Sequence, residues 1–248
     1  MTITLAISCE DGVVLASDSM GSSRHVATSI PKVRVAPRLD VSWTTTGSEF
    51  LDQAVGQAIQ SLDSESAGSS SDVAGAIRPV IMSALEKPLP PTDGSASPHH
   101  VECLIAAWSE YGPSLVHLPG DLAPINCVDK SFVSTGSAHE FAHVVFATLS
   151  HLVETPITVV QAKLLAYRIV NTVCSVSSWG VALPVQMSTV TKSGASMVSG
   201  PELDQLDAEV AGWLAFEASQ FVSPAFLGAG VVSLLVPTET PAEQGDVG

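Results

Sequence analysis

Residues 1–19 read MTITLAISC, then EDG, then VVLASDS. β-Branched and aliphatic residues flank an Asp-Gly pair, a pattern that predicts two short strands joined by a tight turn. Thr2 directly follows the initiator methionine, so removal of Met1 would leave it as the N-terminal residue. The α-amine of such a threonine can act as a base for its own hydroxyl, which is a poor nucleophile without one.

The register of this hairpin decides whether a carboxylate shares a face with Thr2. If residues 10–12 form a three-residue loop, Cys9 pairs with Val13. Side chains alternate along a strand, so Thr2 and Asp18 then lie on one face. A two-residue loop would place Asp18 on the other face. We expect the three-residue loop.

Five segments resemble, in order, catalytic proteasome β-subunits and the related HslV peptidase, which belong to the N-terminal nucleophile (Ntn) hydrolases. They correspond to the first hairpin, a lysine before a strand, a strand ending at a glycine turn, a central hairpin, and a Gly-Ser turn before a helix. The segments are Thr2–Ser19, Ile30–Val35, Trp43–Ser48, Val101–His117 with Gly120, and Val133–Ser137. The resemblance extends over residues 2–195 and points to a bacterial, proteasome-like branch.

The resemblance implies an α+β fold, a four-layer αββα sandwich of two antiparallel sheets between helical layers. Hydrophobic periodicity agrees with it, because it predicts helices over 49–62, 72–86 and 137–153. A fourth helix is expected to begin at Thr155-Pro156, with Thr155 as its cap.

Three further expectations concern the chain's organisation. Pro79 lies inside the second predicted helix and should kink or split it. Strands are expected to return near residues 181–190. Residues 1–237 are expected to form a single domain, followed by a disordered polar tail over 238–248.

The resemblance also implies the active-site residues. Thr2 would be the nucleophile, and Lys32 would be the positive neighbour that lowers the pKa of its amine. Asp18 would pair with Lys32 and keep it charged. The backbone N–H of Gly47 would stabilise the oxyanion of the tetrahedral intermediate. Thr135 matches a family serine whose hydroxyl lies near the threonine amine and helps to relay protons.

One part of the family pattern is missing. The family has an aspartate in an Asp-x-x-Ser-Gly turn, and this carboxylate orients the amine and the hydroxyls. Residues 177–181 of this chain read SSWGV, so Ser178 falls nearest to the aspartate position. Ser178 is therefore the candidate there, and the loss of the carboxylate puts full activity in question.

The same alignment predicts a substrate pocket. Gly21, Ile30, Thr45 and Glu49 would line the primary specificity site. The small Thr45 leaves room for a side chain, and Glu49 favours a basic or polar one.

Composition excludes several other classes of protein. The 248 residues carry a net charge of −15 with only ten Lys and Arg, which argues against a nucleic-acid partner. The N-terminus has no signal-peptide pattern, and polar residues interrupt the uncharged stretch 218–237, so no membrane partner is expected. Four scattered cysteines predict reduced thiols and a cytoplasmic location. No cofactor is expected.

A rival motif lies at residues 139–143, which read HEFAH and match H-E-x-x-H, the helical zinc-binding pattern of metalloproteases. The extended pattern would need glycine at 146 and histidine at 149, but Phe146 and Leu149 occupy these positions. His151 and Glu154 are conceivable third ligands without a recognisable context. The motif is therefore the weakest alternative.

The sequence predicts a cytoplasmic threonine peptidase that attacks peptide or protein substrates through an acyl-enzyme. Transfer of the acyl group to an amine instead of water remains open. The family resemblance implies a homo-oligomeric ring or stack, and leaves open an ATP-dependent unfoldase as partner. The alternative from another class is a non-catalytic ring scaffold of the same fold.

Overall fold

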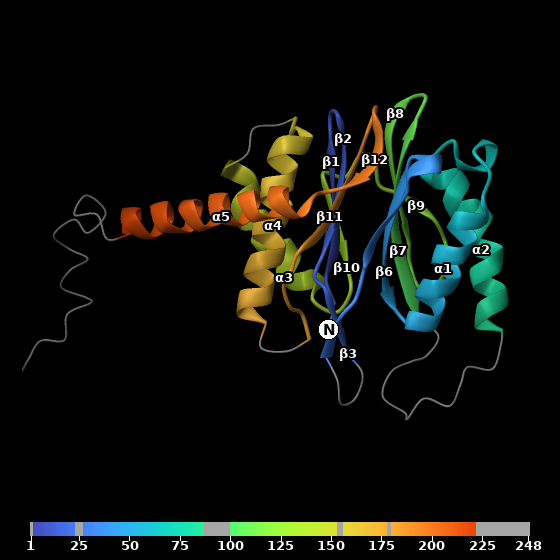
Figure 1. The fold of residues 1–248 in the computed structure, drawn as a ribbon, viewed down its shortest axis with the longest axis horizontal. Helices are drawn as coiled ribbons and strands as arrows, with labels where there is room; N and C mark the ends of the chain where they lie inside the picture. Colours follow the sequence, from blue (N-terminus) through green and yellow to red (C-terminus); the bar gives the residue numbers. More distant parts are fainter. Residues whose placement is uncertain (1, 23–26, 87–99, 153–155, 178–179, 222–248) are drawn as a thin grey trace, which may run out of the picture. The chain divides into compact units, whose positions relative to one another are not determined.

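The computed structural model describes residues 2–22, 27–86, 100–152, 156–177 and 180–221 (Figure 1). The chain divides into two compact units, residues 1–207 and 208–248. The described part of the second unit, 208–221, is the C-terminal portion of helix α5 (Gly200–Phe221). The predicted tail over 238–248 lies outside the described residues.

The N-terminal hairpin lies inside a five-stranded antiparallel sheet. Strands β1 (Thr4–Cys9) and β2 (Gly12–Ser17) pair with each other, as residues 1–19 predict. The strand order is β10-β1-β2-β11-β12. The other members are β10 (Phe132–Thr135), β11 (Gln186–Thr191) and β12 (Gly194–Met197).

A second five-stranded antiparallel sheet has the order β5-β6-β7-β8-β9. Its strands are β5 (Val33–Ala36), β6 (Val41–Gly47), β7 (Val101–Ser109), β8 (Gly112–Leu118) and β9 (Ile125–Asn126). A short ribbon of β3 (Met20–Ser22) and β4 (Ala27–Ser29) connects the two sheets in sequence.

Two apolar clusters hold the sheets in place. Between the sheets, Leu15 of β2 packs in one cluster with Leu104 of β7 and Leu115 of β8. On the other face of the second sheet, Trp43 packs with residues of α1 (Glu49–Ser61) and α2 (Ser70–Leu85). Figure 1 shows α1 and α2 beside the second sheet, and α3 (His139–Leu149) and α4 (Val159–Val176) beside the first. The fold is thus α+β with antiparallel sheets.

The helix boundaries differ from prediction at two places. The start predicted at Thr155-Pro156 is wrong, because α4 begins at Val159 with Thr158 as its N-cap. Thr158 and Gln161 form a reciprocal capping box, which satisfies two backbone N–H groups at once. Thr155 itself lies outside the described residues. Helix α3 is shorter than predicted and ends in a 3-10 turn, Ser150–Leu152.

Pro79 does not split α2, which continues from Ser70 to Leu85. It is exposed, so water can reach the carbonyl group that the proline ring leaves without an amide donor. Two further 3-10 turns, Pro37–Leu39 and Glu65–Ala67, lie beside β6 and α2 in the chain. Across the described residues, none of the helices combines the length and the apolar character needed to cross a membrane.

Candidate active site

The first hairpin has a two-residue loop, so the three-residue loop that we expected is wrong. Cys9 pairs with Gly12, and Thr4 pairs with Ser17. Gly12 is not left-handed. It is needed because a Cβ at this position would overlap the carbonyl oxygen of Val190 on the neighbouring strand β11. This close approach of β11 is not visible from the local sequence.

Asp18 still reaches the site, because it lies just past the end of β2, where strict alternation no longer applies. Its backbone N–H donates to the Ile3 carbonyl at 3.3 Å. Its carboxylate accepts the N–H of Ile3 at 3.1 Å and the N–H of Met20 at 2.9 Å. The side chain is fully buried. These backbone bonds fix the carboxylate and stabilise its charge.

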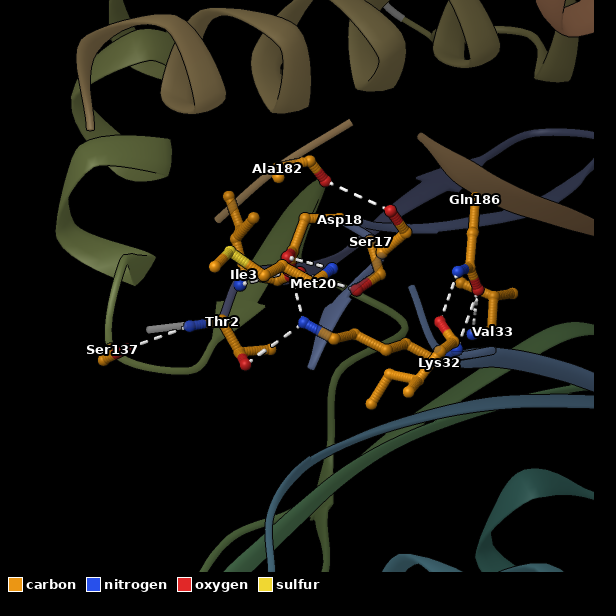
Figure 2. Close-up of polar contacts among 12 residues, drawn as sticks. Thr2, Ile3, Ser17, Asp18, Met20, Lys32, Val33, Ser137, Ala182 and Gln186 are labelled. Atoms are coloured by element: carbon orange, nitrogen blue, oxygen red, sulfur yellow. Dashed lines mark hydrogen bonds and ion pairs between the residues drawn. The ribbon is translucent and has the colours of Figure 1, made fainter. Parts of the chain in front are cut away.

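Lys32 brings its amine between Asp18 and Thr2 (Figure 2). The Nζ atom donates to Asp18 Oδ1 at 2.8 Å and to Thr2 Oγ1 at 3.2 Å. Only 5% of the Lys32 side chain is exposed. Burial lowers the pKa of the Lys32 amine, and the Asp18 charge opposes that shift. The three residues that the sequence singled out at this point therefore form one contact group.

The segment before β5 is held by Gln186 at the start of β11. The Gln186 Oε1 atom accepts the backbone N–H of Lys32 at 2.7 Å and of Val33 at 3.2 Å, and its Nε2 donates to the Ile30 carbonyl at 2.6 Å. Sequence reasoning missed Gln186, because its partners lie more than 150 positions away. It fixes the backbone from which the Lys32 side chain extends.

The turn after β10 holds the backbone of Thr2. The Thr2 N–H donates to Ser137 Oγ at 3.0 Å, and the Thr2 carbonyl accepts the N–H of Ala138 at 3.2 Å. Gly136 has φ of 94°. A Cβ there would overlap the Thr2 carbonyl oxygen and lie 3.2 Å from Thr46 Cγ2. Thr2 and Thr46 therefore lie beside the same glycine.

Ser137, not Thr135, makes the contact with the Thr2 nitrogen that we expected of Thr135. Thr135 is buried and lies 3.4 Å, oxygen to oxygen, from Thr46. Its hydroxyl donates to Glu102 Oε2. The signal for Ser137 was present in the Gly-Ser pair after the strand, where the serine lies two residues beyond the position assigned.

Gly47 is the last residue of β6, with φ of 115°. A Cβ would overlap the carbonyl of His100, and that carbonyl accepts the N–H of Ser48 at 2.9 Å. The backbone at Gly47 thus requires glycine for its φ and for the close approach of His100. Thr46, one residue earlier, places this strand end beside the turn that holds Thr2.

Of the four residues expected to line a pocket, the structure shows two in contact with each other. Gly21 and Ile30 are close, since a Cβ on Gly21 would lie 2.8 Å from Ile30 Cδ1. Thr45 is buried and donates to Asp52, and Glu49 is exposed at the start of α1.

Asp52 also pairs with Arg34 at 2.5 Å, a charge pair that sequence reasoning missed. The guanidinium offsets the Asp52 charge, so this side of the site is less acidic than the sequence suggests.

Glu102 on β7 forms a second polar group with three histidines nearby. Its Oε1 lies 3.2 Å from His100 Nε2, and its Oε2 lies 3.5 Å from His117 Nε2. The nearby His117 imidazole lowers the pKa of Glu102 most, and His100 and His139 add to this, while burial opposes it. Ser178, the sequence candidate for the missing carboxylate position, lies outside the described residues.

The H-E-x-x-H residues make local contacts. His139 Nδ1 lies 2.8 Å from the Gly136 carbonyl oxygen, and His143 packs edge-on against Phe132 with ring centroids 5.0 Å apart. In the described ranges, no group of three or more His, Cys, Asp or Glu side chains could hold a metal ion. The zinc alternative therefore gains no support from these residues.

Solved structures share this fold. Anbu (ancestral beta-subunit) from Yersinia bercovieri has a TM-score of 0.71, with 13% identity over 89% of this chain and 96% of that one. The Anbu (Gly-1) mutant from Hyphomicrobium sp. strain MC1 has a TM-score of 0.66, with 15% identity over 90% of this chain and 99% of that one. No family model and no curated protein matches the chain.

These comparisons show that the chain has the proteasome-like fold of the ancestral beta-subunits. They also correct the family assignment made from the sequence. The similar structures are Anbu proteins, so the assignment to catalytic proteasome β-subunits and HslV is wrong. Short motifs shared across one fold do not separate its branches, because similar strand ends and turns recur in all of them.

Proposed function

We propose that this chain is a threonine-type N-terminal nucleophile peptidase, in which removal of Met1 exposes Thr2 as the nucleophile. The contact of Lys32 Nζ with Thr2 Oγ1 at 3.2 Å, with Lys32 held by the buried Asp18, carries this proposal. A buried lysine with a lowered pKa in contact with a hydroxyl supports a chemical role for this pair. The proposal includes the four-layer αββα arrangement and a cytoplasmic location.

In the proposed reaction a neutral amine takes the proton of the Thr2 hydroxyl, and Oγ1 attacks the carbonyl carbon of a peptide bond. The α-amine of Thr2 and the Lys32 amine are the candidate bases. Burial lowers the pKa of Lys32, so a larger fraction is neutral at a given pH. The backbone at Gly47 is the candidate oxyanion donor.

Collapse of the tetrahedral intermediate breaks the C–N bond, and the leaving amine takes up the proton. An ester between Thr2 Oγ1 and the acyl group remains. The catalytic amine that served as base in the first step then deprotonates water. This water attacks the ester and releases a carboxylic acid and free Thr2. An amine in place of water would give a new amide bond, so hydrolysis and acyl transfer share the first step.

The proposed specificity pocket is lined by Gly21, Ile30, Thr45 and Glu49. Glu49 is the candidate for the charged residue that selects the substrate side chain, because the nearby Asp52 is already paired with Arg34. We expect a preference for basic or polar side chains at the primary subsite. A peptide library that showed an acidic preference there would contradict this assignment.

We further propose that the chain assembles into a homo-oligomeric ring or stack. The description of the similar structures as ancestral beta-subunits supports this, since a subunit belongs to an assembly. An ATP-dependent unfoldase is the partner class that such a ring would need for folded substrates. Mass measurement of the native assembly tests the first point directly.

Intact mass before and after treatment with a β-lactone tests the nucleophile, with Thr2→Ala and Thr2→Ser as variants. We expect a chain without Met1 and a single adduct that Thr2→Ala abolishes and Thr2→Ser retains. Retention of Met1, or an adduct that persists in Thr2→Ala, would contradict the proposal. The scaffold alternative, favoured by the absence of a carboxylate in residues 177–181, predicts no adduct at all.

A further inference from the structure

Glu102 is placed to act on the site from the second sheet. On β7, Glu102 lies two and four positions before Leu104 and Ala106 and therefore shares their face of the strand. Leu104 and Ala106 face the first sheet in the inter-sheet cluster. It lies opposite Thr46 on β6. Its side chain is 23% exposed. A carboxylate therefore projects between the two sheets at the end where β6 finishes at Gly47.

The contact from Glu102 to Thr135 crosses from one sheet to the other. Thr135 ends β10 and pairs with Thr4 of β1. Its hydroxyl lies between Glu102 Oε2 and Thr46 Oγ1. The polar chain Thr46–Thr135–Glu102 thus joins the end of β6 and the start of β7 to the end of β10.

The charge of Glu102 fixes which groups donate and which accept in the hydrogen bonds that link Thr46, Thr135 and Glu102. With its pKa lowered by the neighbouring imidazoles, Glu102 is ionised at neutral pH and can only accept hydrogen bonds. Thr135 must then donate to Glu102, which leaves its oxygen free to accept from the Thr46 hydroxyl. A hydrogen bond to an ionised carboxylate is about twice as strong as one between neutral groups.

Gly136 and Ser137, which follow Thr135 directly, hold the Thr2 backbone. Gly47, which follows Thr46 directly, is the candidate oxyanion donor. A change at Thr135 therefore shifts the nucleophile relative to the oxyanion donor. Displacements of about 1 Å between reacting groups cost about 100-fold in rate.

We propose that Glu102 is a positioning residue for Thr2, acting through Thr135. This inference rests on the proposed function. Glu102 does not touch the substrate or Thr2 in this role. It holds the Gly136–Ser137 turn at a fixed distance from the end of β6.

A double-mutant cycle on the rate of Thr2 acylation by a β-lactone tests the proposal. Thr135→Val removes the hydroxyl with little change in shape, Thr135→Ser keeps it, and Glu102→Gln removes the charge. We expect Thr135→Val and Glu102→Gln each to lower the acylation rate about tenfold, and Thr135→Ser to stay within about threefold of the parent. The double variant should be no slower than the slower single variant.

Peptide turnover supplies a readout that a purely structural role would not move. We expect kcat to fall in Thr135→Val and Glu102→Gln, with KM within about twofold of the parent, in samples of equal folded fraction by circular dichroism. Unchanged acylation in both variants, or losses that multiply in the double variant, would overturn the proposal. If the parent chain forms no adduct, the proposed function fails instead, so the two failures are distinguishable.

Discussion

Two polar groups flank Thr2, and they are built in different ways. Asp18 and Lys32 come from the first 32 residues, are almost fully buried and form one charge pair. Glu102 and Thr135 come from strands 33 positions apart, and the carboxylate is partly exposed beside His100 and His117. Asp18 and Lys32 are the closed group: they are close in the sequence, buried from water and joined as one charge pair. Glu102 and Thr135, with the histidines beside the carboxylate, are the open group, which the tertiary fold assembles and solvent partly reaches.

This difference separates two tasks. The buried pair holds an amine against the nucleophile, which requires a fixed protonation equilibrium away from water. The Glu102 group joins two sheets, which requires a strong directional bond but not exclusion of solvent. Variants that break the Glu102 group should therefore leave the Asp18–Lys32 pair intact, and variants that break the pair should leave the Glu102–Thr135 contact intact.

The largest effect on activity is expected for a change at Thr2, the residue that the two groups flank. Thr2→Ala should lower peptide cleavage by at least about 1,000-fold, because the reaction loses its nucleophile. Thermal unfolding should change little, since Thr2 contributes only one of the contacts of the buried pair. Steady-state kinetics with a fluorogenic peptide, with Thr2→Ser as the matched control, provides the measurement. Equal loss in both variants would argue against a hydroxyl nucleophile.

Asp18→Asn should produce the largest loss of stability. It leaves the Lys32 amine buried without its partner charge, and removal of one member of a buried pair costs about 3–5 kcal/mol. The same change should lower the pKa of Lys32 further, because the opposing carboxylate is gone. Urea denaturation at pH 7 measures the free energy of unfolding.

Glu102→Gln is the matched control for this measurement, because it also replaces a carboxylate by its amide. It should cost less than Asp18→Asn, since Glu102 is partly solvated. Equal losses in the two variants would remove the distinction between the closed and the open group.

The closed group was predictable because its parts lie in local patterns. The hairpin brings Asp18 back to Thr2. Lys32 was assigned because the segment Ile30–Val35 resembles the family's lysine before a strand. The loop length was wrong all the same, because Cys9 pairs with Gly12 and not with Val13. Asp18 reaches the site through backbone bonds past the strand end, which alternation does not describe.

The open group was not predictable from such patterns. Nothing near Glu102 in the sequence distinguishes it from a solvated strand residue, and its contact with Thr135 depends on how the two sheets pack. Ser137 was within reach, because the Gly-Ser pair after β10 marks a tight turn. Gln186 and the Arg34–Asp52 pair needed the tertiary structure.

Gly136 joins the two groups, and Gly136→Ala should weaken both. Its φ of 94° is unfavourable for alanine, and the new methyl group would meet the Thr2 carbonyl and Thr46. We expect a loss of about 1–3 kcal/mol in unfolding free energy, together with slower acylation of Thr2. Chemical denaturation and lactone kinetics measure the two effects.

Gly112→Ala is the matched control for Gly136→Ala, because Gly112 has a similar φ of 113° with open space around it. It should lose stability without slowing acylation. A Gly136→Ala variant with parental acylation kinetics would show that the turn does not position Thr2.

The smallest expected effect is in the pH dependence of stability, which should rise with pH for both groups but over different pH windows. The pKa of Glu102 is lowered on folding by His117, His100 and His139, so its contribution is present above about pH 4.5 and is lost as pH falls through its folded pKa. The pKa of Lys32 is lowered by burial. The cost of keeping that amine charged is present at low pH and is relieved as pH rises through its folded pKa towards 10.5.

Measured from pH 3 to pH 9, the difference in unfolding free energy between the parent and Glu102→Gln should therefore be largest above about pH 4.5 and should shrink below it. A difference that is constant down to pH 3 would mean that the imidazoles do not stabilise the Glu102 charge. The open group would then act through its hydrogen bond alone, and the electrostatic contrast between the two sides of Thr2 would not hold.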